Sequence, residues 1–223
     1  MEKSRKDGDN AVSLDFGLSK GLLSEQFQKA WPYDFGLVYS VTLGKDSLET
    51  QLQVVNKGTR DFDFQILTHS YLNIEVGSSP SASENENLLV SFQDISKIRI
   101  GNLQSKTYID KTRDASTFTE NSSALVINGE TDRVYENLDP NSPVVIFSAD
   151  DGNALFSIIR DALQDTVIWN PWEEKTKGMS DLSPDDAYKR FLCVESGSVS
   201  SWQKVEAGDS WVGAQTIKAG PQA

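Results

Sequence analysis

Short runs rich in β-branched and aromatic residues recur along most of this 223-residue chain, at roughly ten-residue spacing, and clusters of Gly, Pro, Asn, Asp and Ser separate them. The clearest pair is 34–43 and 47–56, joined by a Gly-Lys-Asp turn. Because the second run alternates Leu48, Thr50, Leu52 and Val54 with Glu and Gln, we expect a hairpin with one wet face. Many short strands favour a β-sandwich or barrel. Further strands are expected at 62–76, 95–100, 124–128, 143–149, 154–160, 166–169, 188–196, 200–206 and 210–217.

Two stretches depart from the strand pattern. Residues 19–31, SKGLLSEQFQKAW, suit either a short helix or a loop. Residues 77–87, GSSPSASENEN, are polar and of low complexity, which predicts an exposed, mobile loop. A chain of this length buries one sizeable core, and all-β domains of this size often stay undivided, so we expect a single domain.

Composition narrows the class of partner and the compartment. Hydrophobic residues make up 38% and charged residues 24%, as in a soluble globular protein. The net charge of −12 argues against nucleic acid as the main partner. The only cysteine, Cys193, excludes an internal disulfide, and no His/Cys cluster with metal-ligand spacing accompanies it. No run approaches the roughly 20 apolar residues of a membrane helix. We therefore expect a cytoplasmic protein without membrane contact.

Familiar catalytic motifs are missing from the sequence. It has no Gly-x-Ser-x-Gly elbow, no phosphate-binding Gly-x-x-x-x-Gly-Lys, no His-Glu-x-x-His and no dinucleotide glycine fingerprint. This disfavours the corresponding hydrolases, nucleotide-binding proteins and zinc peptidases.

An acid and a histidine in apolar strands are the first candidates for chemistry. Glu195 ends four apolar residues in FLCVESG, where it either points to water or is held for chemistry, because an unpaired buried carboxylate is costly. The only histidine, His69, lies in LTHSYLNI and is either a structural strand residue or a proton donor near neutral pH. Cys193 shares the face of Glu195 and is interpreted as packing, since no second histidine would activate it.

Two polar and aromatic stretches are candidates for ligand binding. Asp132 and Arg133 stand together before an aromatic residue and suit either a solvated turn or a ligand contact. Trp169 and Trp172 bracket Asn170 in a tight turn; such rings and amides are typical of carbohydrate sites, and the alternative is a tryptophan-capped core.

Several motifs together resemble one family. Residues 165–197, from DTVIWNPW to FLCVESG, are similar to the C-terminal signature of the aldose 1-epimerase-like family, in its hexose-6-phosphate mutarotase branch. LTHSYLNI resembles that branch's His-Thr-Tyr-Phe strand, KTYIDKT its Tyr-x-Asp-Lys loop and ETDRVYENL its Asp-Arg-Val-Tyr segment. These segments follow the family's order, and the similarity runs from about residue 31 to residue 217.

The resemblance implies an all-β, galactose mutarotase-like β-supersandwich that interconverts the α and β anomers of a hexose 6-phosphate. It implies Glu195 as general base, His69 as general acid and Asp132 as a partner of sugar hydroxyls, with Trp169, Asn170 and Arg133 as further substrate contacts. The expected protein is a monomer that binds a small sugar phosphate and uses no metal or other cofactor.

Departures from the family pattern suggest a shortened chain. Family members carry earlier strands with a substrate-contacting arginine and, in a His-Gly-Phe-Ala-Arg segment, a second active-site histidine, and neither has a counterpart in this sequence. We therefore expect a sandwich lacking its first strands, with a variable, partly disordered segment at 1–30, the domain at 31–218 and a tail at 219–223. The alternative function is a non-catalytic relative that binds a carbohydrate or a partner.

Overall fold

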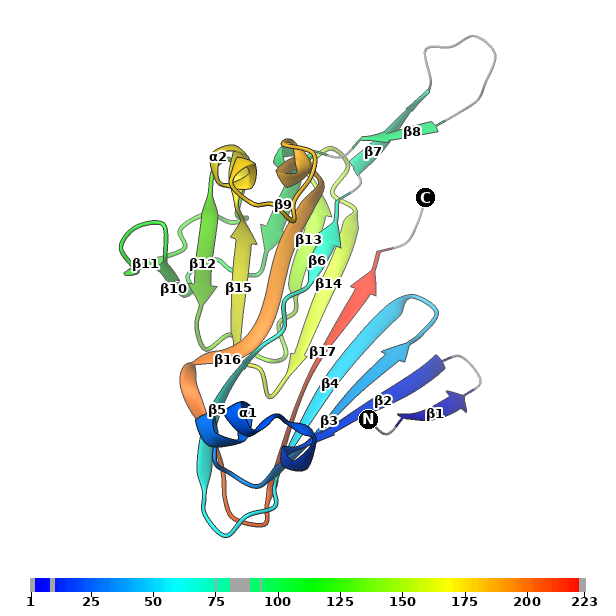
Figure 1. Ribbon diagram of the computed structural model, residues 1–223. Helices are drawn as coiled ribbons and strands as arrows, with labels where there is room; N and C mark the ends of the chain where they lie inside the picture. The colour runs from blue at the N-terminus through cyan, green and yellow to red at the C-terminus, as the bar shows by residue number, and fades with distance from the viewer. Residues whose placement is uncertain (1–2, 9–10, 75, 81–88, 93, 221–223) are drawn as a thin grey trace.

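Two antiparallel β-sheets form the body of the protein in the computed structural model, which describes residues 3–8, 11–74, 76–80, 89–92 and 94–220 (Figure 1). The predicted sandwich is confirmed. The larger sheet has eight strands in the order β1-β2-β3-β4-β17-β14-β13-β9. Its strands are β1 (Lys3–Gly8), β2 (Ala11–Ser19), β3 (Phe35–Leu43), β4 (Ser47–Asn56), β9 (Ile98–Gly101), β13 (Val144–Ser148), β14 (Ala154–Asp161) and β17 (Ser210–Ala219).

The smaller sheet carries most of the candidate functional residues. It runs in the order β11-β10-β12-β15-β16-β5, and β6 also pairs with β16. Its strands are β5 (Phe62–Leu67), β6 (Tyr71–Asn73), β10 (Thr107–Asp110), β11 (Ser116–Thr119), β12 (Thr131–Tyr135), β15 (Asp165–Asn170) and the long β16 (Phe191–Val205). A separate hairpin pairs β7 (Val76–Pro80) with β8 (Leu89–Phe92).

Helices are short and lie at the ends of the sheets (Figure 1). They are the α-helices α1 (Glu25–Ala30) and α2 (Trp172–Lys177) and the 3₁₀-helices η1 (Lys20–Leu22), η2 (Ile95–Lys97) and η3 (Ala187–Arg190). In the part of the chain that the structure describes, none of them has the length and apolar character to cross a membrane.

The main core lies between the two sheets at the β9, β13 and β14 end of the larger one. Ile100, Ile146 and Ile158 from that sheet and Ile168 and Leu192 from the smaller sheet are fully buried there. A second cluster under the other end of the smaller sheet contains Phe35, Val54, Phe62, Phe64 and Val205. Burial of these side chains is the main source of the sandwich's stability, at about 25 cal/mol per Å² of apolar surface removed from water.

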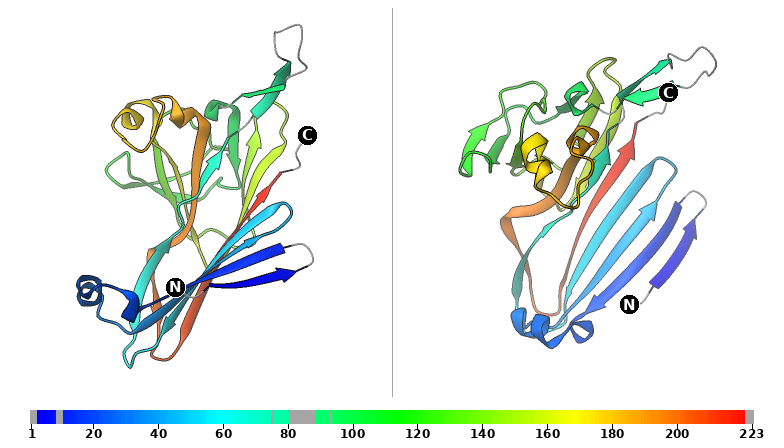
Figure 2. Two further views of the ribbon diagram at one scale, coloured as in Figure 1. Left: turned by 45° about the vertical axis from the view of Figure 1, so that its right-hand side comes forward. Right: turned by 45° about the horizontal axis from the view of Figure 1, so that its top comes forward.

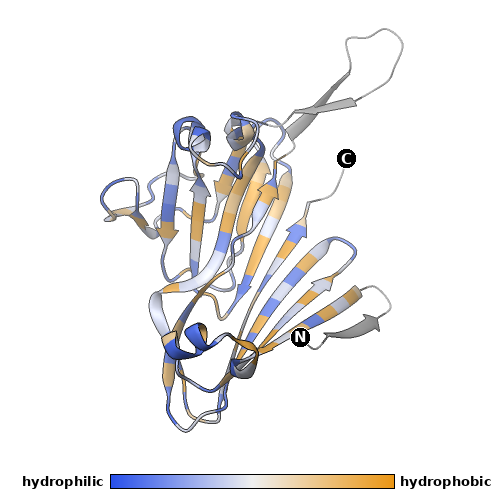
Figure 3. Ribbon diagram, viewed as in Figure 1, coloured by the Kyte–Doolittle hydropathy of each residue, from blue (hydrophilic) through white to orange (hydrophobic). Residues whose placement is uncertain are grey.

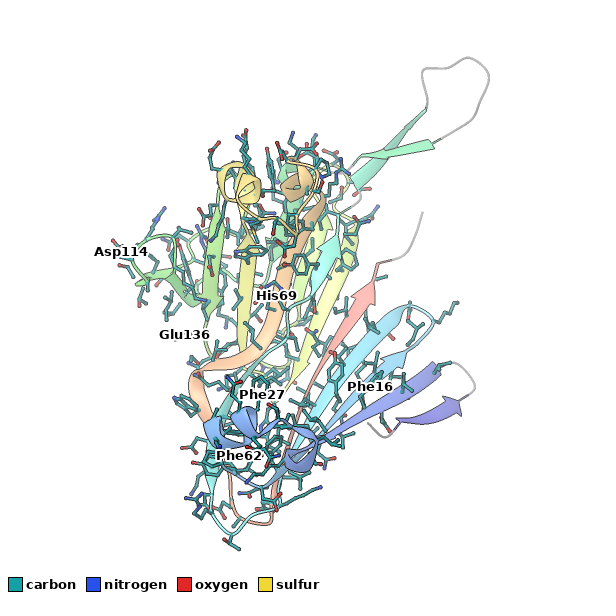
Figure 4. The ribbon with its side chains drawn as sticks, in the orientation of Figure 1. Phe16, Phe27, Phe62, His69, Asp114 and Glu136 are labelled. Carbon is teal, nitrogen blue, oxygen red and sulfur yellow. The ribbon has the colours of Figure 1, made fainter. Side chains whose placement is uncertain are left out.

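The apolar face of the larger sheet continues beyond the smaller sheet. The register aligns Ile217 with Leu48, Leu48 with Leu43, and Leu43 with Val12, so one apolar face crosses β17, β4, β3 and β2 (Figure 3). Figure 2 shows β2 to β4 extending away from β10 to β12. Leu43 is 61% exposed and Val12 44%, and Figure 4 places Phe16 on the same extension. We call this surface the open apolar face.

Most predicted strands are present. The hairpin of β3 and β4 is confirmed, with Gly44 N donating to Ser47 O across its turn. The predicted strand 124–128 is wrong: Leu125 makes only a single bridge to Ile100, and Ile127 packs into the core from a loop. The run is apolar because two of its side chains, Leu125 and Ile127, are buried, and not because it pairs along a strand. Asn, Ser and Gly residues flank it.

Other boundaries differ from the prediction. The predicted strand 62–76 divides into β5 and β6 around residues 68–70, so His69 lies in the link between strands. The sheet already begins ahead of residue 31, because 11–19 alternates apolar side chains and pairs with β3. Residue 219 belongs to β17 rather than to a tail. Residues 77–80 of the predicted loop lie in β7, while 81–87 and 221–223 are outside the described residues.

Candidate active site

His69 and Glu195 lie opposite each other on one face of the smaller sheet. β16 pairs with β5 through Gly197 opposite Leu67, and its ladder with β6 keeps the same register. This register continues through the link 68–70 and sets His69 opposite Glu195. His69 Nε2 is 3.3 Å from Glu195 Oε1. Figure 4 labels His69 near the middle of β16. Strand pairing thus brings together two residues that are far apart in the sequence.

The link that carries His69 is held by Gln215 of β17. Thr68 Oγ1 donates to Gln215 Oε1 at 3.1 Å, and Gln215 Nε2 donates to Ser70 Oγ at 2.8 Å. Ser196 N also donates to Thr68 Oγ1, at 3.0 Å. Gln215 is buried. Because both neighbours of His69 are hydrogen-bonded to the larger sheet, the backbone that carries the imidazole is held in place opposite Glu195.

Glu195 is buried, as the apolar run before it requires. Its side chain is 4% exposed, whereas that of His69 is 50% exposed. The pKa of Glu195 is raised to about 7, chiefly by burial; the Asp132 carboxylate contributes to this rise, and the positive charge of Lys111 opposes it. A carboxyl group with this pKa both accepts and returns a proton near neutral pH, which suits general acid–base chemistry.

A row of side chains crosses the sheet beside this pair. The ladders align Asp132 with Trp169, Trp169 with Cys193, and Cys193 with Tyr71. The His69 ring stacks on Tyr71 at 4.9 Å between centroids and meets Trp169 edge-on at 5.8 Å. The imidazole is thus held against two aromatic rings, whose faces are suited to pack on the C–H groups of a sugar.

Asp132 provides a polar group at the other end of the row. It is partly buried, and Lys111 Nζ lies 3.7 Å from its Oδ1. Lys111 N also donates to Asp132 O at 2.8 Å, so the two residues are tied together through backbone and side chain. Burial raises the pKa of Asp132, and the positive charge of Lys111 opposes that shift. This end of the site therefore offers both an acceptor and a cationic donor.

Arg133 lies on the opposite face of the smaller sheet from Asp132. Successive strand residues point to opposite faces, so Arg133 lies on the core side of the sheet while Asp132 faces the site. Its Nη1 donates to Glu120 Oε2 at 2.9 Å, its Nε is 3.6 Å from Asp110 Oδ2, and its guanidinium lies over the Tyr108 ring. These contacts make Arg133 part of a structural ion-pair network.

Asn170 is also structural. It is fully buried, its Nδ2 donates at 2.9 Å to both Tyr188 O and Phe191 O, and its Oδ1 accepts from Trp172 N at 2.9 Å. The side chain fixes the turn from β15 into α2 to the start of β16. The amide predicted to contact a sugar is therefore used within the fold.

Asn170→Ala is expected to lower the free energy of unfolding by about 2–4 kcal/mol, because it leaves buried backbone groups without partners. Urea unfolding measures this, with Asn128→Ala, a change at an exposed asparagine, as the control. Unchanged stability combined with weakened sugar binding would contradict the structural role.

A groove borders the site along the edge of the smaller sheet. It has a volume of about 770 Å³ and lies between the segment 66–73 and the β3, β4, β14 and β17 face of the larger sheet. His69 and Tyr71 line it, whereas Glu195 and Asp132 do not. His69 therefore stands between the groove and the buried carboxylate.

One set of side chains has the composition of a metal site. Ligand atoms of His69, Cys193 and Glu195 all lie within 4.8 Å of one another. The sequence spacing did not indicate this cluster, because the histidine and the cysteine come from segments that meet only through strand pairing.

Comparison with known proteins places this chain in a family. A family model described as aldose 1-epimerase matches residues 2–218. The chain belongs to the aldose 1-epimerase family. A solved structure titled "putative mutarotase (YeaD)" from Salmonella typhimurium superposes with a TM-score of 0.77 at 27% identity, over 98% of this chain and 64% of that one. The fold is a galactose mutarotase-like β-sandwich.

Two curated relatives of this family member have the name "Putative glucose-6-phosphate 1-epimerase". The one from Cenchrus ciliaris is 29% identical over 201 residues, which are 89% of this chain and 54% of that protein. The one from Escherichia coli (strain K12) is 29% identical over 203 residues, which are 91% of this chain and 58% of that protein. The chain thus spans little more than half the length of these curated relatives.

Sequence reasoning missed several residues around the site of this aldose 1-epimerase family member. The sequence pattern marks Tyr71 and Phe191 only as strand residues, although Tyr71 is two positions from His69 and Phe191 two positions from Cys193, so that each shares the face of a candidate. Gln215 gave no signal, because its role depends on how the two sheets pack. Lys111 is one of several cationic residues in this part of the sequence, and only its contacts with Asp132 distinguish it from the others.

Proposed function

We propose that this protein catalyses the interconversion of the α and β anomers of an aldohexose, with a hexose 6-phosphate as its substrate. The observation that carries the proposal is the contact of 3.3 Å between His69 Nε2 and Glu195 Oε1. Anomerisation needs a base for the C1 hydroxyl proton and an acid for the ring oxygen. Since both oxygens are bonded to the same carbon, the acid and the base must lie close together, as this pair does.

The steps follow from the positions of the two groups. Glu195 accepts the proton of the C1 hydroxyl while protonated His69 donates one to the ring oxygen, and the C1–ring oxygen bond breaks to give the open-chain aldehyde. Rotation about the C1–C2 bond presents the other face of the carbonyl to the C5 hydroxyl. Ring closure then reverses both transfers, since His69 takes back its proton and Glu195 returns the other. Each proton transfer contributes about 10²–10⁴-fold.

Neighbouring side chains are suited to hold the sugar. Asp132 accepts hydrogen bonds from ring hydroxyls, and the rings of Trp169 and Tyr71 pack on the C–H face. Arg133 and Asn170 take no part, because their polar atoms bind within the fold. The choice of a 6-phosphate rests on the names of the curated relatives.

The test follows the optical rotation of freshly dissolved α-glucose 6-phosphate with and without protein, beside unphosphorylated glucose and galactose. The proposal expects a first-order approach to equilibrium whose rate rises in proportion to protein concentration, fastest for the phosphorylated sugar. A rate equal to that of buffer for all three sugars would contradict the catalytic function and favour a binding protein.

The catalysed rate is expected to fall on the acid side of neutrality. Glu195 must be ionised to accept a proton, and its pKa is raised to about 7, so kcat/KM at pH 6 should be roughly a tenth of its plateau value. The profile is measured in buffer with a chelator. Asp132→Asn should move the acid limb to lower pH, because Asp132 raises this pKa, and Lys111→Met should move it to higher pH. Shifts of the same sign in both variants would contradict this electrostatic account.

A further inference from the structure

The thiol of Cys193 has no part in the proposed proton transfers, yet it lies beside both groups that perform them. Ligand atoms of Cys193, His69 and Glu195 are mutually within 4.8 Å. Cys193 is fully buried, and the register places it between Trp169 and Tyr71. A buried cysteine packs like any small apolar residue. What sets it apart from alanine or serine is the reactivity of its sulfur, including metal binding. What this sulfur can bind is therefore a separate question.

The spacing of the three ligand atoms suits a tetrahedral ion. Zn²⁺ binds nitrogen and oxygen at about 2.0–2.2 Å and sulfur at about 2.3 Å, which places ligand atoms about 3.3–3.6 Å apart. His69 Nε2 and Glu195 Oε1 are already 3.3 Å apart, and none of the three ligand atoms is more than 4.8 Å from another. The gap left between the ligand atoms is therefore at most about 1.5 Å, which movement of the Cys193 and His69 side chains has to close when the ion binds.

The donor set selects the kind of cation. One thiolate, one imidazole and one carboxylate make a borderline-soft site, whereas Ca²⁺ and Mg²⁺ prefer oxygen alone. Three protein ligands leave the fourth tetrahedral position to water or a sugar hydroxyl. Binding releases the thiol proton to solvent, since the thiolate is the ligand. The rings of Trp169 and Tyr71 both contact the His69 imidazole and so lie beside the cluster.

We propose that His69, Cys193 and Glu195 bind Zn²⁺ or a similarly soft divalent cation, and that the cation reversibly inhibits the enzyme. Binding itself follows from the cluster alone. Inhibition rests on the proposed function, because the ion would bind both the base and the acid of the anomerisation. A protein with this site would lose activity as free Zn²⁺ rises and regain it when a chelator removes the ion.

Metal binding is tested on untagged protein without any turnover. The chain has one histidine and one cysteine, so no other imidazole or thiol competes. Calorimetric titration with Zn²⁺ should give one site. Co²⁺ should produce a near-ultraviolet thiolate-to-cobalt absorption band that Zn²⁺ then removes. Cys193→Ser should lose this band and weaken Zn²⁺ binding by at least about tenfold, because serine lacks the soft sulfur donor.

His69→Asn is a second test of the same site, for the case that Cys193→Ser does not fold. Since His69 is half exposed, its replacement leaves the core intact. It too should weaken Zn²⁺ binding by at least about tenfold. One-site binding that survives both substitutions, or no binding at 100 µM Zn²⁺ (about a hundredfold above a micromolar Kd), would overturn the proposal. Cys193→Ser should keep its basal anomerisation rate but resist Zn²⁺. If no sugar is turned over, the binding results still stand and only the proposed function fails.

Discussion

Glu195→Gln is expected to reduce catalysed anomerisation by at least about a hundredfold, the lower end of what one positioned base contributes. Gln has the shape of Glu but cannot accept the C1 hydroxyl proton at neutral pH. The substitution also removes a buried ionisable group whose pKa is raised by burial, so the folded state should not lose stability. A large loss of rate in a stable protein is therefore the signature of the proposed base.

Polarimetry measures this rate, and thermal unfolding followed by circular dichroism measures the stability. Glu206→Gln, the same change at an exposed glutamate of the loop after β16, is the matched control and should keep the full rate. A Glu195→Gln protein that retains more than about half of the catalysed rate would remove this residue from the chemistry, since loss of a base lowers the rate by far more.

His69→Asn is expected to lower the catalysed rate by a similar factor, about a hundredfold or more, because the ring oxygen then has no acid positioned beside it. Asn keeps a polar but shorter side chain that does not reach the position of Nε2, and the half-exposed site should tolerate it without loss of stability. The ring contacts of His69 with Tyr71 and Trp169 disappear, which is a minor change at the surface.

Chemical rescue separates an acid from a structural residue. Since the side chain of His69 is 50% exposed, added imidazole should enter the space left by His69→Asn and restore part of the rate. The same addition should leave Glu195→Gln inactive, which serves as the control. If imidazole fails to rescue and the variant also melts at a lower temperature, the result would assign His69 a structural role instead.

Local pattern was enough to predict the sandwich but not every strand in it. Alternation and turn residues marked β3, β4 and β17, because a half-buried strand shows its two faces in the sequence. The prediction of a strand at 124–128 was wrong, because a buried loop and a buried strand share the same apolar composition. β10 and β11 were missed, since TYID and STFT are short and half polar.

The candidate site divides along the same line. Glu195 and His69 stood out as an acid and a lone histidine in apolar strands, and the register then set them opposite each other. Arg133 and Asn170 looked like ligand contacts, but one points to the core and the other binds backbone groups. Neither outcome was readable from the residues, because it depends on which face and which neighbours the fold supplies.

The open apolar face has a consequence for how this protein behaves in the laboratory. Val12, Tyr39, Leu43 and Leu48 are each at least 36% exposed on one continuous surface of the larger sheet. Dyes that fluoresce on apolar surfaces bind such patches in the folded state. A strong dye signal at low temperature would therefore report this sheet and not unfolded molecules, so melting curves should be followed by circular dichroism.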